Sequence, residues 1–231
     1  MSGQQGVFQR DTLQRISSAG LVIGAVLLVV FNLLYPRPAD PSSAQSVLTA
    51  MADQKVLTQL SQLMLALGFW GLMIGSAGVH RSITDRGAAW ARLGFYGIVG
   101  GTAIWSINFG LGLASANAAS DWVVASVADK AAAYDVANTF LTVNSGIYTM
   151  SILMFWLALI FLGAGMARNP VYPQWFGWVA VVLGIAMVAI VGIPRFLVEN
   201  STSSMFIFAG LSLLTTVWFL VVGIWVARRA W

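Results

Sequence analysis

The chain has 231 residues, of which 58% are hydrophobic and only 9% are charged. A water-soluble domain needs about 25% charged residues to cover its surface, so this composition excludes that class and indicates lipid as the main solvent. The net charge is +4, but the twelve Lys and Arg form no dense basic cluster, which excludes nucleic acid as a partner. The chain also lacks cysteine, which excludes disulfides, iron–sulfur clusters and thiolate nucleophiles.

Several stretches are apolar over the roughly 20 residues that a helix needs to cross a bilayer. All six prolines lie at the ends of these stretches or between them, where a missing backbone donor is tolerated. The pattern predicts an all-α protein, a single transmembrane domain over residues 1–231 that forms a bundle of six transmembrane helices. The predicted spans are residues 17–35, 58–80, 91–116, 139–167, 173–195 and 204–227.

Two long connections, residues 42–57 and 120–137, are predicted to be helical as well. Ser42 or Ser43 can cap the first, and Ser120 can cap the second, which is rich in alanine. Each is expected to run into the following span as a helix that protrudes from the membrane.

Lys and Arg residues are distributed unevenly between the two sides of the predicted bundle. The side that holds both termini carries eight of the twelve basic residues and two of the eight acidic residues. The other side holds both long connections and carries four basic and six acidic residues. Because basic residues favour the cytoplasmic side, we expect both termini in the cytoplasm and both connections outside the cell.

Pairs of glycines spaced four residues apart allow two helices to approach closely in lipid. Such pairs are Gly20 and Gly24, Gly71 and Gly75, and Gly97 and Gly101. They predict either packing within the bundle or a seam between two copies of the chain. Besides the lipid bilayer itself, other membrane subunits or a homo-oligomer are therefore candidate partners.

Residues that could carry catalysis or hold a metal are scarce. His80 is the only histidine, so the chain cannot supply the several nitrogen ligands of a zinc, copper or non-haem iron site, and one axial haem ligand is all that stays open. No Asp, Glu or Lys lies at mid-depth in a predicted span, which argues against ion-coupled transport and intramembrane acid–base catalysis. We expect a protein that is not an enzyme, with no metal site built from protein ligands alone, and the cofactor is unknown.

Uncharged polar side chains collect in the outer halves of the predicted spans, which are the halves nearest the two long connections. In lipid such groups turn towards the bundle interior to find hydrogen-bond partners. They predict either a shallow pocket open to the outside or hydrogen bonds that only hold the helices together. The candidate ligand-binding residues are Trp105, Asn108, Asn144, Tyr148, Arg195 and Glu199. Arg195 and Glu199 are spaced so that they can pair along one helix.

The fourth and fifth spans carry a run of interface features: residues 157–163, Arg168, residues 172–178 and Gly184. A span that ends in a glycine turn and a basic residue, followed by a Pro-x-Trp-x-Gly entry, resembles small bacterial multi-span membrane proteins of unknown function, the DUF4386-like kind. The resemblance covers roughly residues 157–184. It implies a location in the bacterial inner membrane, and it supplies no activity and no site residues.

Two functional hypotheses follow from the sequence. The first is a non-enzymatic polytopic membrane protein, either an accessory subunit of a membrane complex or a binder of an apolar ligand such as a lipid, quinone or pigment. The alternative is a small channel or facilitator that uses the outer polar cluster as an outward-facing vestibule.

Overall fold

The computed structural model describes residues 12–197 and 202–230, and this part of the chain contains only helices and their connections. Six of its helical segments are long and apolar enough to cross a membrane, so the chain is a multi-pass membrane protein and the predicted all-α bundle of six spans is confirmed. The spanning helices are α1 (Thr12–Leu34), α3 (Lys55–Ser82), α4 (Ala88–Val124), α5 (Lys130–Ala167), α6 (Gln174–Ala186) with its extension to α7 (Ile193–Leu197), and α8 (Thr202–Ala230).

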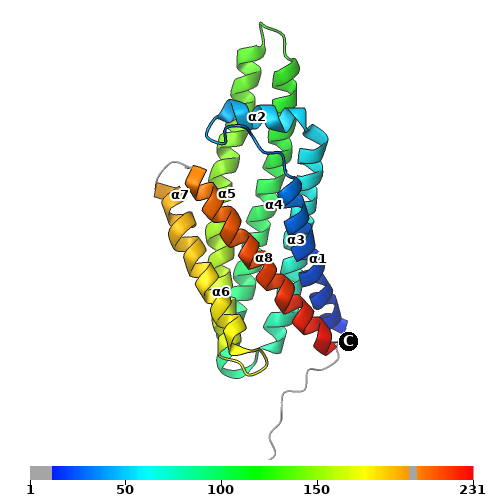
Figure 1. Ribbon diagram of the computed structural model, residues 1–231, viewed down its shortest axis with the longest axis vertical. Helices are drawn as coiled ribbons and strands as arrows, with labels where there is room; N and C mark the ends of the chain where they lie inside the picture. Colours follow the sequence, from blue (N-terminus) through cyan, green and yellow to red (C-terminus); the bar gives the residue numbers. More distant parts are fainter. Residues whose placement is uncertain (1–11, 198–201, 231) are drawn as a thin grey trace, which may run out of the picture.

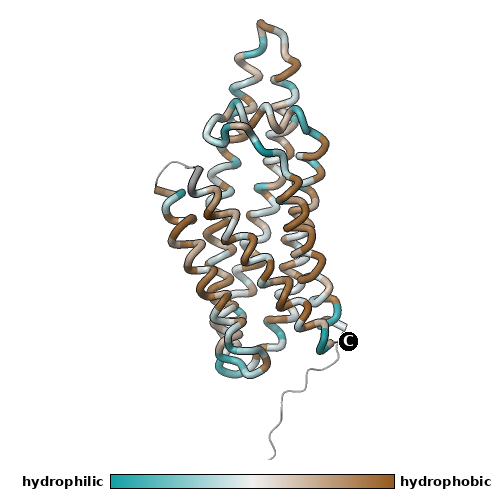
Figure 2. The backbone as a smooth tube through the Cα atoms, in the orientation of Figure 1, coloured by the Kyte–Doolittle hydropathy of each residue, from teal (hydrophilic) through white to brown (hydrophobic). Residues whose placement is uncertain are grey.

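The spanning helices form a closed ring. Helices α1, α3, α4, α5 and α6 pack successively against one another, and α8 packs against both α1 and α6. Figure 1 shows α8 crossing the bundle diagonally, from the start of α1 at one end towards α7 at the other. The interior of the ring is filled by large aromatic side chains, among them Phe69, Trp105, Phe155, Trp156 and Phe219, each at most 8% exposed. Figure 2 shows apolar residues along the middle of the spans and hydrophilic residues at the connections.

Glycines bring the first two spans into backbone contact. A Cβ atom on Gly24 would lie 2.7 Å from the carbonyl oxygen of Gly68, and one on Gly71 would lie 2.8 Å from the carbonyl oxygen of Gly20. On α4, a Cβ atom added to Gly101 would lie 3.0 Å from the Cα atom of Phe155 on α5. The glycine pairs singled out in the sequence therefore face helices of their own chain, which is the first of the two interpretations.

Helices α4 and α5 are longer than a bilayer requires. They have 37 and 38 residues, which at 1.5 Å per residue is about 55 Å, against a hydrocarbon core of about 30 Å. They form a hairpin that protrudes beyond the other spans (Figure 1). The expected single helix over residues 120–137 is wrong: α4 continues through Ser120 to Val124, and a tight turn separates it from α5. Within the turn the Ser126 hydroxyl donates to a carboxylate oxygen of Asp129 at 2.6 Å.

Helix α2 (Ala44–Asp53) lies across the base of this hairpin (Figure 1). The Ser43 side chain caps it by accepting a hydrogen bond from the backbone N–H of Ser46, as one of the two candidate caps was expected to do. The helix ends before residue 57, because the backbone leaves the helical region at Gln54, and α3 begins at the next residue. The buried side chains that join α2 to the hairpin are Leu48, Met51, Ala119, Trp122 and Ala137.

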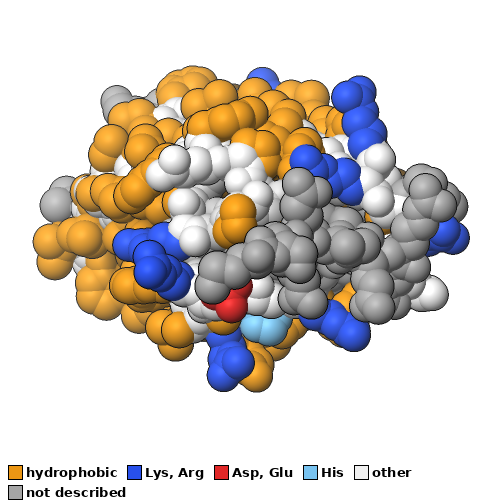
Figure 3. Space-filling model, turned by 90° about the horizontal axis from the view of Figure 1, so that it is seen from below, with side chains coloured by type: hydrophobic (Ala, Val, Ile, Leu, Met, Phe, Trp, Pro, Cys, Tyr) orange, Lys and Arg blue, Asp and Glu red, His pale blue; other side chains and the backbone are white. Residues whose placement is uncertain are grey.

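The two ends of the bundle differ in charge. At the end where α1 begins and α8 ends, the described residues include seven arginines and a single acid, Asp85. These arginines are Arg15, Arg81, Arg86, Arg92, Arg168, Arg228 and Arg229. Figure 3 shows basic side chains distributed around the rim of this face. The opposite end, which holds α2 and the hairpin, carries five Asp among its described residues: Asp40, Asp53, Asp121, Asp129 and Asp135.

Candidate ligand site around Tyr148

Two of the predicted site residues bond to each other across the α4–α5 interface. The side-chain amide of Asn108 donates to the backbone oxygen of Asn144 at 3.1 Å and to its side-chain oxygen at 2.7 Å. Asn108 is only 4% exposed, so both bonds lie in a medium of low dielectric constant. Asn108 and Asn144 therefore join two helices by hydrogen bonds, which is the second of the two interpretations given for the outer polar side chains.

Trp105 lies one turn before Asn108 on α4 and is 3% exposed. Its ring stacks on Phe69 with a centroid distance of 4.7 Å and meets Tyr148 edge to face at 5.2 Å. The indole Nε1–H has no hydrogen-bond acceptor among the residues that the structure describes. A buried donor without an acceptor costs about 1–3 kcal/mol, so native structures rarely leave one unmatched.

Tyr148 connects the tryptophan to a cation. The Cζ atom of Arg195 lies 4.9 Å from the centroid of the tyrosine ring, close enough for a cation–π contact. Phe208 of α8 meets the same ring edge to face at 5.4 Å. Trp105, Tyr148 and Arg195, from α4, α5 and α7, therefore form one continuous set of contacts, here called the Tyr148 cluster.

The backbone before Arg195 departs from the α-helical geometry expected for residues 173–195. Residues Met187–Gly192 form a π-helix, in which the N–H of Ile193 bonds five residues back to Val188. Pro194 offers a physical reason, because its ring clashes with the carbonyl four residues before it and it has no N–H to donate. The wider turn rotates the residues that follow, and it sets the direction in which Arg195 leaves the helix.

Arg195 carries a second buried donor for which the described residues offer no partner. Its Nε atom is buried, and no acceptor for it exists within residues 12–197 and 202–230. Ionisable groups inside a membrane span are expensive and mark functional positions more often than structural ones. The predicted partner Glu199 lies outside the described residues.

A small cavity lies in the centre of the ring, beside the Tyr148 cluster. Its volume is ≈ 20 Å³, about what one water molecule needs. It touches Phe69 and Trp156, which both contact Trp105, and its polar lining is Asn32, Ser212, Thr215 and Thr216. The three α8 residues were missed at the sequence level, although their spacing (i, i+3, i+4) places them on one helix face.

Three of the four polar residues that line this cavity have hydrogen-bond partners within the protein. Asn32, Thr215 and Thr216 each donate to the carbonyl four residues earlier at 2.8 Å. The Trp156 indole donates to the Thr215 hydroxyl at 3.2 Å. The donors of Asn32, Thr215 and Thr216 are therefore matched, in contrast to the Tyr148 cluster, where two donors have no acceptor among the described residues.

Other polar residues of the outer half also bond across helix interfaces. The Gln59 amide donates to the Asn117 side chain at 2.9 Å, and the Gln62 amide donates to the Tyr35 hydroxyl at 3.0 Å. The Trp70 indole donates to Ser106 at 3.0 Å. Among the described residues, no group of three or more His, Cys, Asp or Glu is placed to hold a metal ion.

Comparisons with protein-family models, with curated proteins and with solved structures find no match to this chain. The class of the protein therefore follows from its fold alone: it is a polytopic helical membrane protein whose six spans contact the lipid bilayer.

Proposed function

We propose that this chain is a non-enzymatic membrane protein that binds an amphiphilic molecule of the lipid or quinone class at the Tyr148 cluster. The observation that carries the proposal is the pair of buried donors, Trp105 Nε1 and Arg195 Nε, on either side of one tyrosine ring. A ligand with a carbonyl, carboxylate or phosphate oxygen would supply the acceptor that the described residues do not offer to either donor.

The surroundings of these donors suit the apolar part of such a molecule. Phe69, Trp156 and Phe208 belong to the same network of ring contacts as Trp105 and Tyr148. Binding sites for small molecules combine apolar and aromatic walls with a few placed polar groups, and this set has that composition. Because the interior of the ring of helices is filled, the quinone ring or acyl chain would lie on the lipid-facing side of this network, and only its oxygen would reach towards Arg195.

The packing of the interior argues against the channel alternative. Aromatic side chains fill the ring of helices, and the central cavity of ≈ 20 Å³ has room for about one water molecule. A channel would need a continuous water-filled path through the ring of helices from its outer vestibule. The role of accessory subunit draws its support from another feature, the protruding hairpin, whose tip exposes Val124 (80%) and Val127 (97%).

The binding proposal is tested by what co-purifies with the full chain. Wild type and Arg195→Gln are purified from the same host membranes in mild detergent, and bound molecules are identified by native mass spectrometry and organic extraction. Wild type is expected to carry one bound amphiphile, and Arg195→Gln is expected to lose it. Arg168→Gln is the matched control, because Arg168 also lies over a ring (Trp90, 5.0 Å), but at the opposite end of the bundle. Equal occupancy of the two variants would contradict the proposal.

We also propose a bacterial inner-membrane location with both termini in the cytoplasm. Support comes from the end where α1 begins and α8 ends. Its described residues include seven arginines and one acid, and basic residues favour the cytoplasmic side. The resemblance of residues 157–184 to DUF4386-like proteins is part of this proposal. An alkaline phosphatase domain fused after Trp231 is expected to be inactive, and one inserted at Val127, in the hairpin turn, is expected to be active. The reverse pattern would contradict the orientation.

A further inference from the structure

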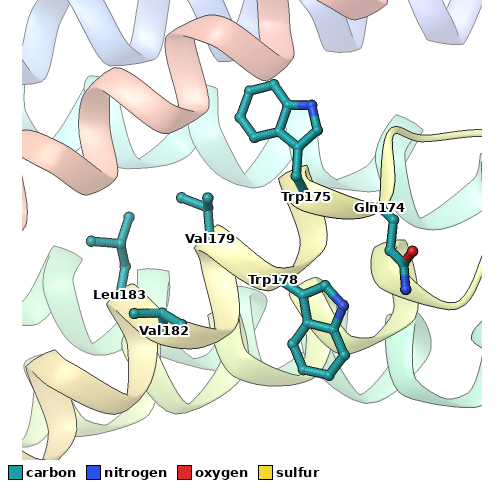
Figure 4. Close-up of a pocket in the computed structure, with 6 residues that line it drawn as sticks. All are labelled: Gln174, Trp175, Trp178, Val179, Val182 and Leu183. Carbon is teal, nitrogen blue, oxygen red and sulfur yellow. The ribbon is translucent and has the colours of Figure 1, made fainter.

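The lipid-facing side of α6 contains a shallow open groove that is formed by residues of this one helix, far from the Tyr148 cluster. It is lined by Gln174, Trp175, Trp178, Val179, Val182 and Leu183. Figure 4 shows Trp175 and Trp178 pointing away from each other in the first turn of α6, with the aliphatic side chains following along the next turns. Trp175, Trp178 and Val182 are 57%, 49% and 62% exposed, so this face is left uncovered by the described helices.

The length of the groove matches one leaflet of a bilayer. From Gln174 to Leu183 the helix rises by about 13 Å, since each residue adds 1.5 Å. Half of a hydrocarbon core of about 30 Å is about 15 Å. The groove begins at the basic end of the bundle and ends near mid-depth, as the acyl chain of a single lipid does.

The two ends of the groove differ in polarity. Its apolar end consists of Val179, Val182 and Leu183, whereas Gln174 lies where α6 leaves the membrane. The cation Arg229 is close to this polar end. Its guanidinium lies 3.8 Å from the Trp225 ring centroid and donates to the backbone oxygen of Val171, three residues before Gln174.

Aromatic contacts join this cation to the groove itself. Trp225 meets the ring of Phe176 at 5.8 Å, and Phe176 meets that of Trp175 at 4.3 Å. Asp85 is the only acid at this end among the described residues, so the local field favours an anion. Tryptophans at headgroup depth complete a site that is basic and amphipathic at one end and aliphatic at the other.

We propose that this groove binds one phospholipid with an anionic headgroup. The headgroup lies between Gln174 and Arg229, and one acyl chain lies along Val179, Val182 and Leu183 beside the two tryptophans. The occupant comes from the surrounding leaflet and is held for longer than the lipids around it. This site lies at the opposite end of the bundle from the Tyr148 cluster, so it does not rest on the function proposed above.

The test uses the full chain reconstituted in vesicles that contain phosphatidylcholine and phosphatidylglycerol in equal amounts. The protein is extracted with mild detergent, and the lipids retained on each chain are counted by native mass spectrometry. Wild type is expected to retain one phosphatidylglycerol in preference to phosphatidylcholine. Val182→Trp fills the groove and is expected to abolish this retention. Val217→Trp is the matched control, a lipid-facing valine on α8 that is 44% exposed and lies outside the groove.

The headgroup part of the proposal has its own pair of variants. Arg229→Gln is expected to remove the preference for phosphatidylglycerol, whereas Arg228→Gln removes the same charge one position earlier and is expected to keep it. Thermal melting of all variants verifies that the bundle is intact. Equal retention of both lipids by wild type, or equal retention by Val182→Trp and Val217→Trp, would overturn the proposal. If Arg228→Gln and Arg229→Gln each lose the preference for phosphatidylglycerol, the overall charge of this end determines binding. That result would exclude a specific headgroup site at Arg229.

Discussion

The half of the bundle near the arginine-rich end and the half near the hairpin are packed in different ways. In the arginine-rich half, glycines place backbone against backbone: an added Cβ atom on Gly24 or Gly163 would lie 2.7 Å from a carbonyl oxygen of the neighbouring helix. In the hairpin half, the buried Gly112 and Gly192 face side chains instead: an added Cβ atom would meet the side-chain amide of Gln62 or the side chain of Leu153. Large side chains, rather than close helix approach, fill the interior there.

The two halves of the bundle also differ in how their polar groups are hydrogen-bonded. The loops at the arginine-rich end are tied together: the hydroxyl groups of Ser82 and Tyr172 share a bond of 2.6 Å, and the Asn169 amide donates to the backbone oxygen of Thr84 at 3.0 Å. Burial raises the pKa of Tyr172 well above its ordinary range, so this hydroxyl stays protonated. In the other half, Trp105 and Arg195 hold buried donors for which the described residues offer no acceptor. The arginine-rich end also holds one buried atom without a partner among the described residues, the Oε1 acceptor of Gln14, so the division concerns unmatched nitrogen donors and the tied loops.

The largest expected effect tests the close-packed half. Gly24→Leu places a side chain where the Cβ alone would meet two backbone atoms of α3, at 2.7 and 2.9 Å. Overpacking costs about 1–3 kcal/mol, and here the obstacle is backbone that cannot rotate away. A clear loss of thermal stability in detergent is expected. Gly146→Leu is the control, because Gly146 is exposed and an added Cβ atom there meets no atom within 4 Å; a similar loss there would show that backbone contact is not the cause.

A pair of tryptophans tests the difference in hydrogen bonding. The Trp218 indole donates to the backbone oxygen of Phe176 at 3.0 Å, so Trp218→Phe is expected to cost about 1 kcal/mol. The Trp105 indole has no such acceptor within the described part of the chain, so Trp105→Phe removes an unmatched donor and is expected to leave the stability of the ligand-free protein unchanged or raised. Unfolding in a mild-to-harsh detergent titration compares the two variants. Equal losses would mean that Trp105 is bonded like Trp218.

The smallest expected effect concerns Asn108 and Asn144. A double-mutant cycle with alanine at both positions measures their coupling free energy, which is expected to be about 0.6 kcal/mol, the average for hydrogen bonds within membranes. Neither single variant is expected to change which molecule co-purifies, because the pair is bonded internally at 2.7 and 3.1 Å. If Asn108→Ala alone lost a bound molecule, Asn108 and Asn144 would belong to the ligand site and would not serve only to join the helices.

The spans could be predicted from the sequence because long apolar runs with proline only at their ends leave few alternatives. The turn between α4 and α5 could not be predicted from the sequence, because residues 125–129 contain neither glycine nor proline and follow an alanine-rich run. Ser126 and Asp129 are the only local signal, and such residues occur within helices as well. Trp105 and Tyr148 were both candidate site residues, but the contact of their rings at 5.2 Å could not be predicted, because depth in the membrane does not fix which helix faces meet. The position of Arg195 depends on the π-helix, whose register has no clear sequence signature.

Helix α8 gives the ring of helices an order of assembly. It is the last of the six spans to be synthesised, and it is the one that joins α1 to α6. Until it inserts, the aromatic interior, including Phe155 and Trp156, faces the lipid through the gap that α8 later fills. Arg15 then donates from α1 to the backbone oxygen of Ala230 at 3.2 Å and fastens the last helix to the first. Before α8 inserts, the other five spans form an open half-ring, and this stage would give the amphiphile proposed above a lateral route to the Tyr148 cluster.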